Sequence, residues 1–302
     1  MTGSVLTVVL IVIGGVVRIT GSGMGCGEHW PRCNGEWFPP LDLPTFIEIF
    51  HRWTAALVSL TIAGVAIIAI RRHRSSRRLL VPALLGLVLL VVQVLLGAVT
   101  VKLELPPSVV IIHLLNAMLV LAAVLWTALE AHAGTASRFT AEHRAPLGWS
   151  LAFAVFGLIV ILWGAQVANL NAGAVCTGFP LCAGAGVGPP RTALGPLHWT
   201  HRVLAYGFLV VSILTLMRVR GPSTPAAVRR AATAVFFATM AQIAVAAAMV
   251  LLALPAELRA LHLGVGTMLW VALVVLVHRA ARAPWPEEAV ERPSLAGAAA
   301  TT

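Results

Sequence analysis

Long runs of apolar residues alternate along the chain with short polar segments, and this pattern predicts membrane-spanning helices. Such a helix needs about 20 predominantly apolar residues, and eight runs reach or approach that length. The predicted spans are Thr2–Thr20, Thr45–Ile70, Leu79–Val101, Val109–Leu129, Leu147–Ala168, Pro196–Met217, Arg230–Leu254 and Ala256–Val277. The first is the weakest, because its uncharged apolar core covers only Val5–Val17. It lacks the basic start and the cleavage site of a signal peptide, so we expect a span whose natural N-terminus lies further upstream.

The composition supports an all-α polytopic membrane protein. Of the 302 residues, 59% are hydrophobic and 11% are charged, and the mean hydropathy is +0.92. A soluble domain has about 45–50% apolar and about 25% charged residues, so a soluble globular protein, a disordered tail and a fibrous repeat are excluded. The net charge of +10 lies in short segments between apolar runs, which indicates membrane orientation and not nucleic-acid binding. A single lysine, Lys102, among many Ala and Val residues is typical of a GC-rich bacterial genome.

The basic residues are divided unequally between the two sides of the predicted membrane. Cytoplasmic loops carry the excess of Lys and Arg, and one side has fourteen while the other has seven. The richer side holds Arg71, Arg72, Arg74, Arg77, Arg78, Arg138, Arg144, Arg218, Arg220, Arg229, Arg230, Arg279, Arg282 and Arg292. We therefore expect a multi-pass protein of the bacterial cell membrane with both termini cytoplasmic and with the longer loops, 21–44 and 170–195, outside.

The two halves of the chain repeat one another at a nearly constant offset. Residues of the same type recur 149 or 150 positions apart, namely Gly14 and Gly164, Cys26 and Cys176, Cys33 and Cys182, His51 and His201, Gln93 and Gln242, and His113 and His262. Sustained self-similarity of this kind indicates a duplication. Each unit has four spans and crosses the membrane in the same sense, so we expect two tandem four-helix bundles related by a pseudo-two-fold axis along the membrane normal. The units are 1–135 and 136–285, and residues 286–302 are expected to form a disordered cytoplasmic tail.

Four of the ten histidines lie inside predicted spans at one depth. These are His51, His113, His201 and His262, each about five or six residues into an even-numbered span. At 1.5 Å per residue they lie roughly 8 Å below the outer end of the helix. A packed polar residue explains one such histidine, but four at matching depth favour iron ligation by facing imidazoles. We expect one six-coordinate haem in each unit. Zinc is disfavoured because no Cys or carboxylate accompanies the pairs, whereas copper remains open.

The remaining histidines have other predicted roles. We expect those in loops or at helix ends to be solvated, namely His29, His73, His132, His143 and His278. His198 stands three residues before His201, where the first half has Glu48 before His51. Because residues i and i+3 share a helix face, Glu48 is a candidate general base beside whatever His51 binds. The alternative is a salt bridge from Glu48 to Arg52 at i+4.

Further polar residues near these histidines have two open interpretations each. Arg52 and Arg202 follow the ligand candidates directly, where they would either meet haem carboxylates or extend to the membrane interface. Gln93 and Gln242 fall in the middle of spans, which favours interhelical hydrogen bonds.

All four cysteines lie in the two longer loops. Cys26 and Cys33 bracket six residues, and Cys176 and Cys182 bracket five. Neither spacing matches CxxC or the CxxCH haem attachment site. Because the outer side is oxidising, one disulfide in each loop is expected. We expect a structural role for the disulfide between Cys176 and Cys182. For Cys26 and Cys33 a redox role stays open.

The combination of residues resembles the haem A synthase family. The match rests on eight spans in two units, on Glu48-x-x-His51-Arg52, His113, His201-Arg202 and His262, and on a cysteine pair in each outer loop. It extends from Gly14 to about His278. The resemblance implies an enzyme that oxidises the C8 methyl of haem O to a formyl group by successive hydroxylations, which yields haem A for cytochrome oxidase.

The same resemblance implies a role for each site residue. His51 and His113 would hold the substrate haem, while His201 and His262 would hold a haem b cofactor. Glu48 matches the family's essential carboxylate. The first cysteine pair of the family corresponds to Cys26 and Cys33, and the second, less widespread pair corresponds to Cys176 and Cys182.

Three other classes of protein are alternatives. A di-haem b electron-transfer protein explains the histidines but leaves Glu48 and the cysteine loops unused. A membrane thiol oxidoreductase explains the cysteines only, and a transporter would require interrupted helices. No pattern in the sequence identifies the electron acceptor, the source of the oxygen or the oligomeric state. A quinone is one candidate acceptor. Lipid contacts the protein, and the pathway suggests haem O synthase and oxidase assembly factors as partners.

Overall fold

A computed structural model describes residues 1–40, 42–133, 144–183 and 186–282, and within these ranges the chain is helical without a β-strand. The α-helices are α1 (Thr2–Ile19), α2 (Leu43–Arg72), α3 (Arg77–Lys102), α4 (Pro107–Ala133), α5 (Arg144–Asn169), α6 (Gly195–Arg218), α7 (Ala226–Leu251) and α8 (Ala256–Arg282). Short 3-10 helices η1 (Ser22–Met24) and η3 (Ala172–Val175) follow α1 and α5. All eight α-helices are long and apolar enough to cross a membrane, which confirms the predicted fold class. The expected tail 286–302 and the boundary at 135 lie outside the described residues.

Several predicted helix ends differ from the structure by a few residues, and at the end of α7 the backbone explains why. The seventh span was expected to reach Leu254, but α7 ends at Leu251. Ala253 and Leu254 have φ values of 61° and 64°, in the left-handed region that an α-helix of L-residues avoids. Glu104 and Leu105 make the same tight connection between α3 and α4, with φ values of 57° and 61°.

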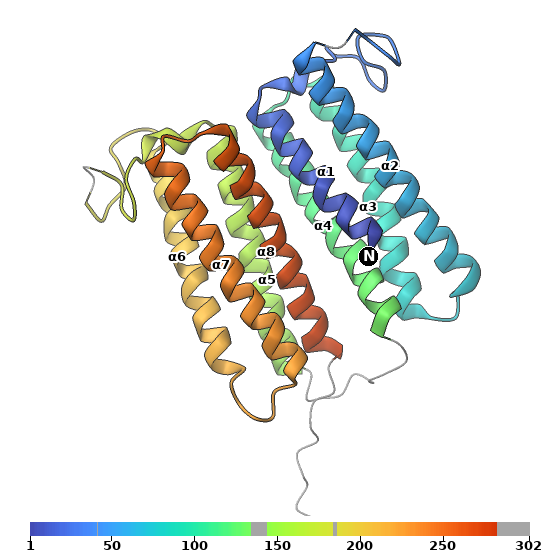
Figure 1. The fold of residues 1–302 in the computed structure, drawn as a ribbon, viewed down its shortest axis with the longest axis vertical. Coiled ribbons are helices and arrows are strands. Elements are labelled where there is room, and N and C mark those ends of the chain that lie inside the picture. Colours follow the sequence, from blue (N-terminus) through green and yellow to red (C-terminus); the bar gives the residue numbers. More distant parts are fainter. Residues whose placement is uncertain (41, 134–143, 184–185, 283–302) are drawn as a thin grey trace, which may run out of the picture.

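The helices gather into two groups that follow the order of the chain. Figure 1 shows α1–α4 on one side of the molecule and α5–α8 on the other, with both cysteine-containing loops at the same end. Contacts within the groups join α3 to α4, α1 to α2, α7 to α8 and α5 to α8, while α4 and α1 contact α8 across the groups. We call the end with the loops the disulfide end. The pseudo-two-fold relation between the groups stays a prediction.

Many large apolar side chains face outward from the bundle. Leu60, Val88 and Phe237 are 73%, 60% and 65% exposed, and in water such surfaces would be costly. Only 11–39% of the most apolar window of each helix is buried inside the protein. The outer faces are therefore suited to the hydrocarbon of a lipid bilayer.

The two groups are joined by apolar packing and by polar contacts at several levels. Trp270 of α8 donates from Nε1 to the carbonyl of Met118 on α4 at 2.9 Å. Nearer the disulfide end, Arg18 of α1 donates from Nε to the side-chain oxygen of Asn169 on α5 at 2.9 Å. These contacts fix α1 and α4 against the second group.

A buried charged cluster joins α4 and α8 at the opposite end. The Nε of Arg282 donates to Oε1 of Glu130 at 2.7 Å, and the Nε2 atom of His278 lies 3.3 Å from the same oxygen. The ring of Trp126 meets the His278 ring edge-on at 5.0 Å between centroids. His278 is 0% exposed, so the expectation of a solvated side chain was wrong. The helix runs past Val277 to Arg282 and packs this last turn on α4.

Candidate functional site

The four histidines of the spans come together as two pairs. His51 on α2 and His113 on α4 are close enough to interact electrostatically, and so are His201 on α6 and His262 on α8. Each pair therefore consists of two imidazoles from different helices of one group, as the sequence predicts. Of the other histidines, His29, His73 and His132 are exposed as expected, and His143 lies outside the described residues.

Polar atoms of these rings have no protein partner although they are shielded. The Nδ1 atoms of His51, His113 and His201 are buried without a hydrogen bond. Buried polar groups are satisfied in the great majority of cases, so atoms of this kind are typical of a site that is completed by a ligand. Among the described residues, His, Cys, Asp and Glu form no group of three or more able to hold a bare metal ion. A pair of imidazoles is a donor set that suits the iron of a haem.

Glycines let the histidine rings lie directly against a neighbouring helix. A Cβ at Gly164 of α5 would stand 2.8 Å from Cε1 of His201, and one at Gly14 of α1 would stand 3.1 Å from Cε1 of His51. At Gly97 of α3 the distance to Cε1 of His113 would be 3.4 Å. A Cβ at Gly164 or Gly14 would therefore crowd the neighbouring ring, whereas one at Gly97 would make an ordinary van der Waals contact.

A glutamine contacts one histidine in each pair. The Nε2 of Gln93 lies 3.1 Å from Nε2 of His113, and the Nε2 of Gln242 lies 3.1 Å from Nε2 of His262. This confirms the prediction of interhelical hydrogen bonds for both glutamines. Asn116 adds a third polar side chain in the first group only, because it donates to Oε1 of Gln93 at 2.8 Å.

Glu48 is buried and held by two donors. Its Oε2 accepts the backbone N–H of Cys26 at 2.8 Å, and its Oε1 accepts a hydrogen bond from Arg52 one turn later. Only 3% of the residue is exposed. The salt bridge that the sequence offered as the alternative is therefore present, and the carboxylate also connects α2 to the first cysteine loop.

Both arginines after the ligand candidates bind loop carbonyls. Arg52 donates to the carbonyls of His29 and Arg32 at 2.9 Å each. Arg202 donates to the carbonyls of Gly178 and Cys176 at 2.9 and 2.6 Å. The sequence suggested that these arginines either meet haem carboxylates or extend to the membrane interface. In the structure each arginine instead binds a loop to the helix that carries a histidine.

The cysteines are paired within the loops as predicted. Cys26 is bonded to Cys33 and Cys176 to Cys182. At the position that corresponds to Glu48, the Nδ1 of His198 lies 3.0 Å from the carbonyl of Ala172. Glu48 is thus the carboxylate that distinguishes the first group from the second at this level.

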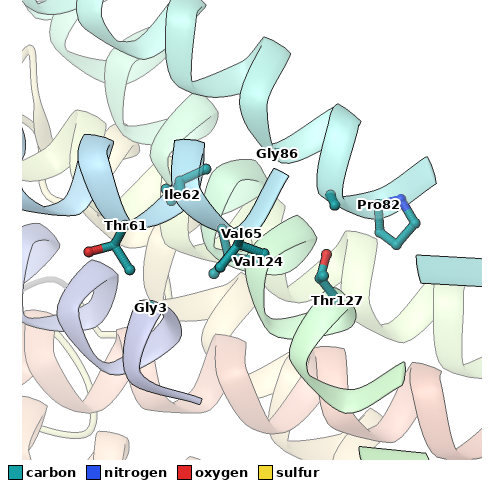
Figure 2. Close-up of a pocket in the computed structure, with 9 residues that line it drawn as sticks. Gly3, Thr61, Ile62, Val65, Pro82, Gly86, Val124 and Thr127 are labelled. Atoms are coloured by element: carbon teal, nitrogen blue, oxygen red, sulfur yellow. The ribbon is translucent and has the colours of Figure 1, made fainter. Parts of the chain in front are cut away.

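A small apolar pocket lies further from the disulfide end (Figure 2). Its lining comes from α1, α2, α3 and α4 and consists of Gly3, Thr61, Ile62, Val65, Pro82, Ala83, Gly86, Val124 and Thr127. Thr61 is ten residues after His51, which corresponds to about 15 Å along the helix. No ionisable side chain lines the pocket, so it is not a site for iron or for acid–base chemistry.

Asn116 and its hydrogen bond to Gln93 beside His113 were missed from the sequence. Asn116 is a polar residue within a span, three positions after His113, and both facts are signals of function in an apolar helix. In the sequence, Gly14 and Gly164 stood out only as members of the repeat, and Gly97 did not stand out. Their contact with histidine depends on how α1 and α5 pack, which no pattern along the chain shows.

Comparison with known proteins identifies relatives over most of this architecture. The family model COX15-CtaA, described as cytochrome oxidase assembly protein, matches residues 1–44 and 42–274. A protein named "Heme A synthase" from Bacillus pumilus (strain SAFR-032) is 30% identical over 199 residues, which are 62% of this chain and 64% of that protein. A protein of the same name from Bacillus cereus (strain AH187) is 33% identical over 186 residues, 59% of each chain. The chain thus aligns with slightly less than two thirds of the length of these relatives.

Proposed function

Because this chain belongs to the COX15-CtaA family of cytochrome oxidase assembly proteins, we propose that it is a haem A synthase. The relatives that carry the name "Heme A synthase" support this proposal. The reaction is the oxidation of the C8 methyl of haem O to a formyl group, and the protein is an oxidoreductase of the bacterial cell membrane. The observation that carries the proposal is the presence of two histidine pairs, together with the buried Glu48 one turn before His51, where the second group has His198.

The first group holds the substrate in this proposal. His51 and His113 would hold the iron of haem O, and Gly14 and Gly97 carry no side chain where the two imidazole rings approach α1 and α3. Two neutral imidazoles leave the charge of the iron unchanged. They would hold the macrocycle by coordinating its iron, with no covalent bond to the porphyrin. The site therefore holds its substrate through iron ligation and apolar contact.

The second group holds haem b. His201 and His262 fit this group because they lie within electrostatic range of one another on α6 and α8, and because His201 has a shielded Nδ1 without a protein partner. When bound, a bis-histidine haem supplies one-electron transfer. His198 and Arg202 hold the loop above this pair and thereby limit access of water to it.

Glu48 is the acid–base residue of the proposed reaction. Oxidation of a C–H bond releases a proton, and a carboxylate next to the substrate is a suitable acceptor. Arg52 and the N–H of Cys26 hold the carboxylate in one orientation. The contact with Cys26 also places the first disulfide next to this residue.

The remaining parts of the proposal concern the surroundings of the enzyme. The family acts in cytochrome oxidase assembly, so haem O synthase and oxidase assembly factors are the expected partners, and a quinone is a candidate electron acceptor. The disulfide end faces outward and both termini face the cytoplasm, in agreement with the distribution of arginines. A di-haem electron-transfer protein is disfavoured because it has no use for Glu48.

Production of haem A in cells that make haem O but lack their own haem A synthase tests the proposal. The unchanged chain should convert haem O to haem A, and Glu48→Gln should abolish conversion while the amount of bound haem stays the same. Glu257→Gln is a matched control, because Glu257 is exposed on α8. Haem A at the unchanged level in the Glu48→Gln cells would refute the role of this carboxylate, and its absence in cells with the unchanged chain would refute the function.

A further inference from the structure

A chain of hydrogen bonds links the backbone of α3 to the iron-ligand candidate of α4. The Nδ2 of Asn116 donates to the carbonyl of Leu89 at 2.9 Å and to Oε1 of Gln93 at 2.8 Å. The Nε2 of Gln93 lies 3.1 Å from Nε2 of His113. Asn116 is only 6% exposed, so bulk water does not compete with these contacts. We call the three side chains, Asn116, Gln93 and His113, the amide relay.

The direction of every bond in the amide relay follows from its first member. A backbone carbonyl only accepts hydrogen bonds, so Asn116 must turn its NH2 group toward Leu89. The second hydrogen of that NH2 group then meets Gln93, which must present its oxygen. Gln93 consequently turns its own NH2 group toward His113, and Nε2 of His113 must accept. The hydrogen of this neutral imidazole therefore resides on Nδ1, which is buried without a protein partner. The lone pair on Nε2 is directed at the Gln93 amide, which has to give way when iron binds.

This form of His113 is the one that binds iron. A metal ligand needs a free lone pair on the coordinating nitrogen, and the hydrogen on the other nitrogen fixes which form is present. If Gln93 turned its oxygen toward the ring, Nε2 would carry the hydrogen and would have to lose it before binding. The amide relay thus selects the competent form of the ligand before haem arrives.

The second group lacks this arrangement. Position 265, which is 149 residues after Asn116, is a valine. The Nε2 of Gln242 lies near both ring nitrogens of His262, at 3.2 and 3.1 Å, and its Oε1 is buried without a partner. No carbonyl therefore determines the orientation of the Gln242 amide.

We propose that Asn116 and Gln93 are positioning residues that keep His113 ready to bind a haem which enters and leaves in every catalytic cycle. The inference rests on the proposed function, because only a substrate site must be emptied and refilled. A buried acceptor without a partner costs about 1–3 kcal/mol, and Gln93 supplies the partner of His113 while no haem is bound. A site with a permanent cofactor is filled once and does not need such a partner.

Two variants and one control separate positioning from general packing. Asn116→Val introduces the residue type of Val265 and frees the Gln93 amide to rotate. Gln93→Leu removes the donor itself and serves if the first variant does not fold. Gln242→Leu is the control, because it makes the corresponding change beside His262.

The full chain is purified in detergent from cells that make haem b but no haem O. Its histidines are labelled with nitrogen-15, and the bound haem b is kept reduced. Imidazole nitrogen shifts report which nitrogen of His113 carries the hydrogen, and stopped-flow absorbance reports the association rate of added haem O. In the unchanged chain and in Gln242→Leu the hydrogen should reside on Nδ1. In Asn116→Val and Gln93→Leu both forms should appear, and haem O should associate about tenfold more slowly.

Each result decides the inference. One form of His113 in all proteins, or equal association rates in Asn116→Val and the unchanged chain, would overturn it. Failure of the unchanged chain to bind haem O would contradict the proposed function instead, and the nitrogen shifts would still test the orientation of His113 by the amide relay.

Discussion

A methyl group added at Gly164 should weaken the binding of haem b, because it occupies the space that the His201 ring uses. The added Cβ would stand 2.8 Å from Cε1, 3.2 Å from Nε2 and 3.4 Å from Nδ1 of this ring. Ordinary contact begins at 3.4 Å, so the ring must retreat by the difference between 3.4 and 2.8 Å, which is 0.6 Å. Ligands of a functional site must be held within about 0.5 Å of their productive positions. The displacement therefore exceeds the tolerance of an iron–imidazole bond.

The energetic cost of this change follows from overpacking. Extra methyl groups in a packed interior typically cost about 1–3 kcal/mol. If the cost falls on the haem-bound form, the affinity for haem b decreases about 5- to 150-fold. Alanine at Gly14 should have a smaller effect on the first site, because the corresponding distance to Cε1 of His51 is 3.1 Å.

The assay is the haem b content of the purified protein together with the low-spin electron paramagnetic resonance signal of the second site. Gly148→Ala is the control in the same helix, since a Cβ at that position meets nothing within 4 Å. A Gly164→Ala protein with full haem b content and an unchanged resonance signal would refute the assignment of His201 as a tightly packed ligand. Equal losses in Gly164→Ala and Gly148→Ala would show that the helix, and not the ligand, had been damaged.

Two further predictions concern the loops and the contact between the two groups. Arg202→Lys should expose the second disulfide, because a lysine cannot reproduce the forked contact with the carbonyls of Cys176 and Gly178. Dithiothreitol should therefore reduce this disulfide faster in the variant than in the unchanged chain, as measured by alkylation of the released thiols. An equal rate of reduction would contradict this role of Arg202. Glu130→Gln should lower the thermal stability by about 1.5–3 kcal/mol, the value of a hydrogen bond to a charged group, because it removes the charge that Arg282 binds. Unfolding in detergent measures this effect; haem content should stay unchanged, and the exposed Glu257→Gln should have no effect on stability.

The helices and the two histidine pairs are readable from the sequence for physical reasons. Apolar runs of sufficient length have one stable form in lipid, which is a helix that satisfies its own backbone. The two histidine pairs follow from equal depth on neighbouring helices, and the disulfides follow from cysteines in one short loop. These predictions depend on distances along the chain, and such distances are printed in the sequence.

Contacts between distant segments were the part that the sequence did not reveal. His278 was expected to be exposed to solvent, because residues at the end of a helix usually are exposed. It instead lies against Glu130 of the first group. The bond from Cys26 to Glu48 spans 22 residues, and its existence depends on how the loop folds back over α2. The bond between Glu48 and Arg52 was foreseen as an alternative, because i+4 spacing brings two side chains of a helix together.

Extraction of the non-covalent haems from the purified protein tests the central claim most directly. The account requires two chemically different haems, since one histidine pair holds a cofactor and the other holds the substrate or product. Chromatography of the extract should show haem b together with haem O or haem A, and the latter should be lost selectively in His113→Ala. Haem b alone at both pairs would contradict the account and would identify an electron-transfer protein, while an extract without haem would contradict the assignment of all four histidines.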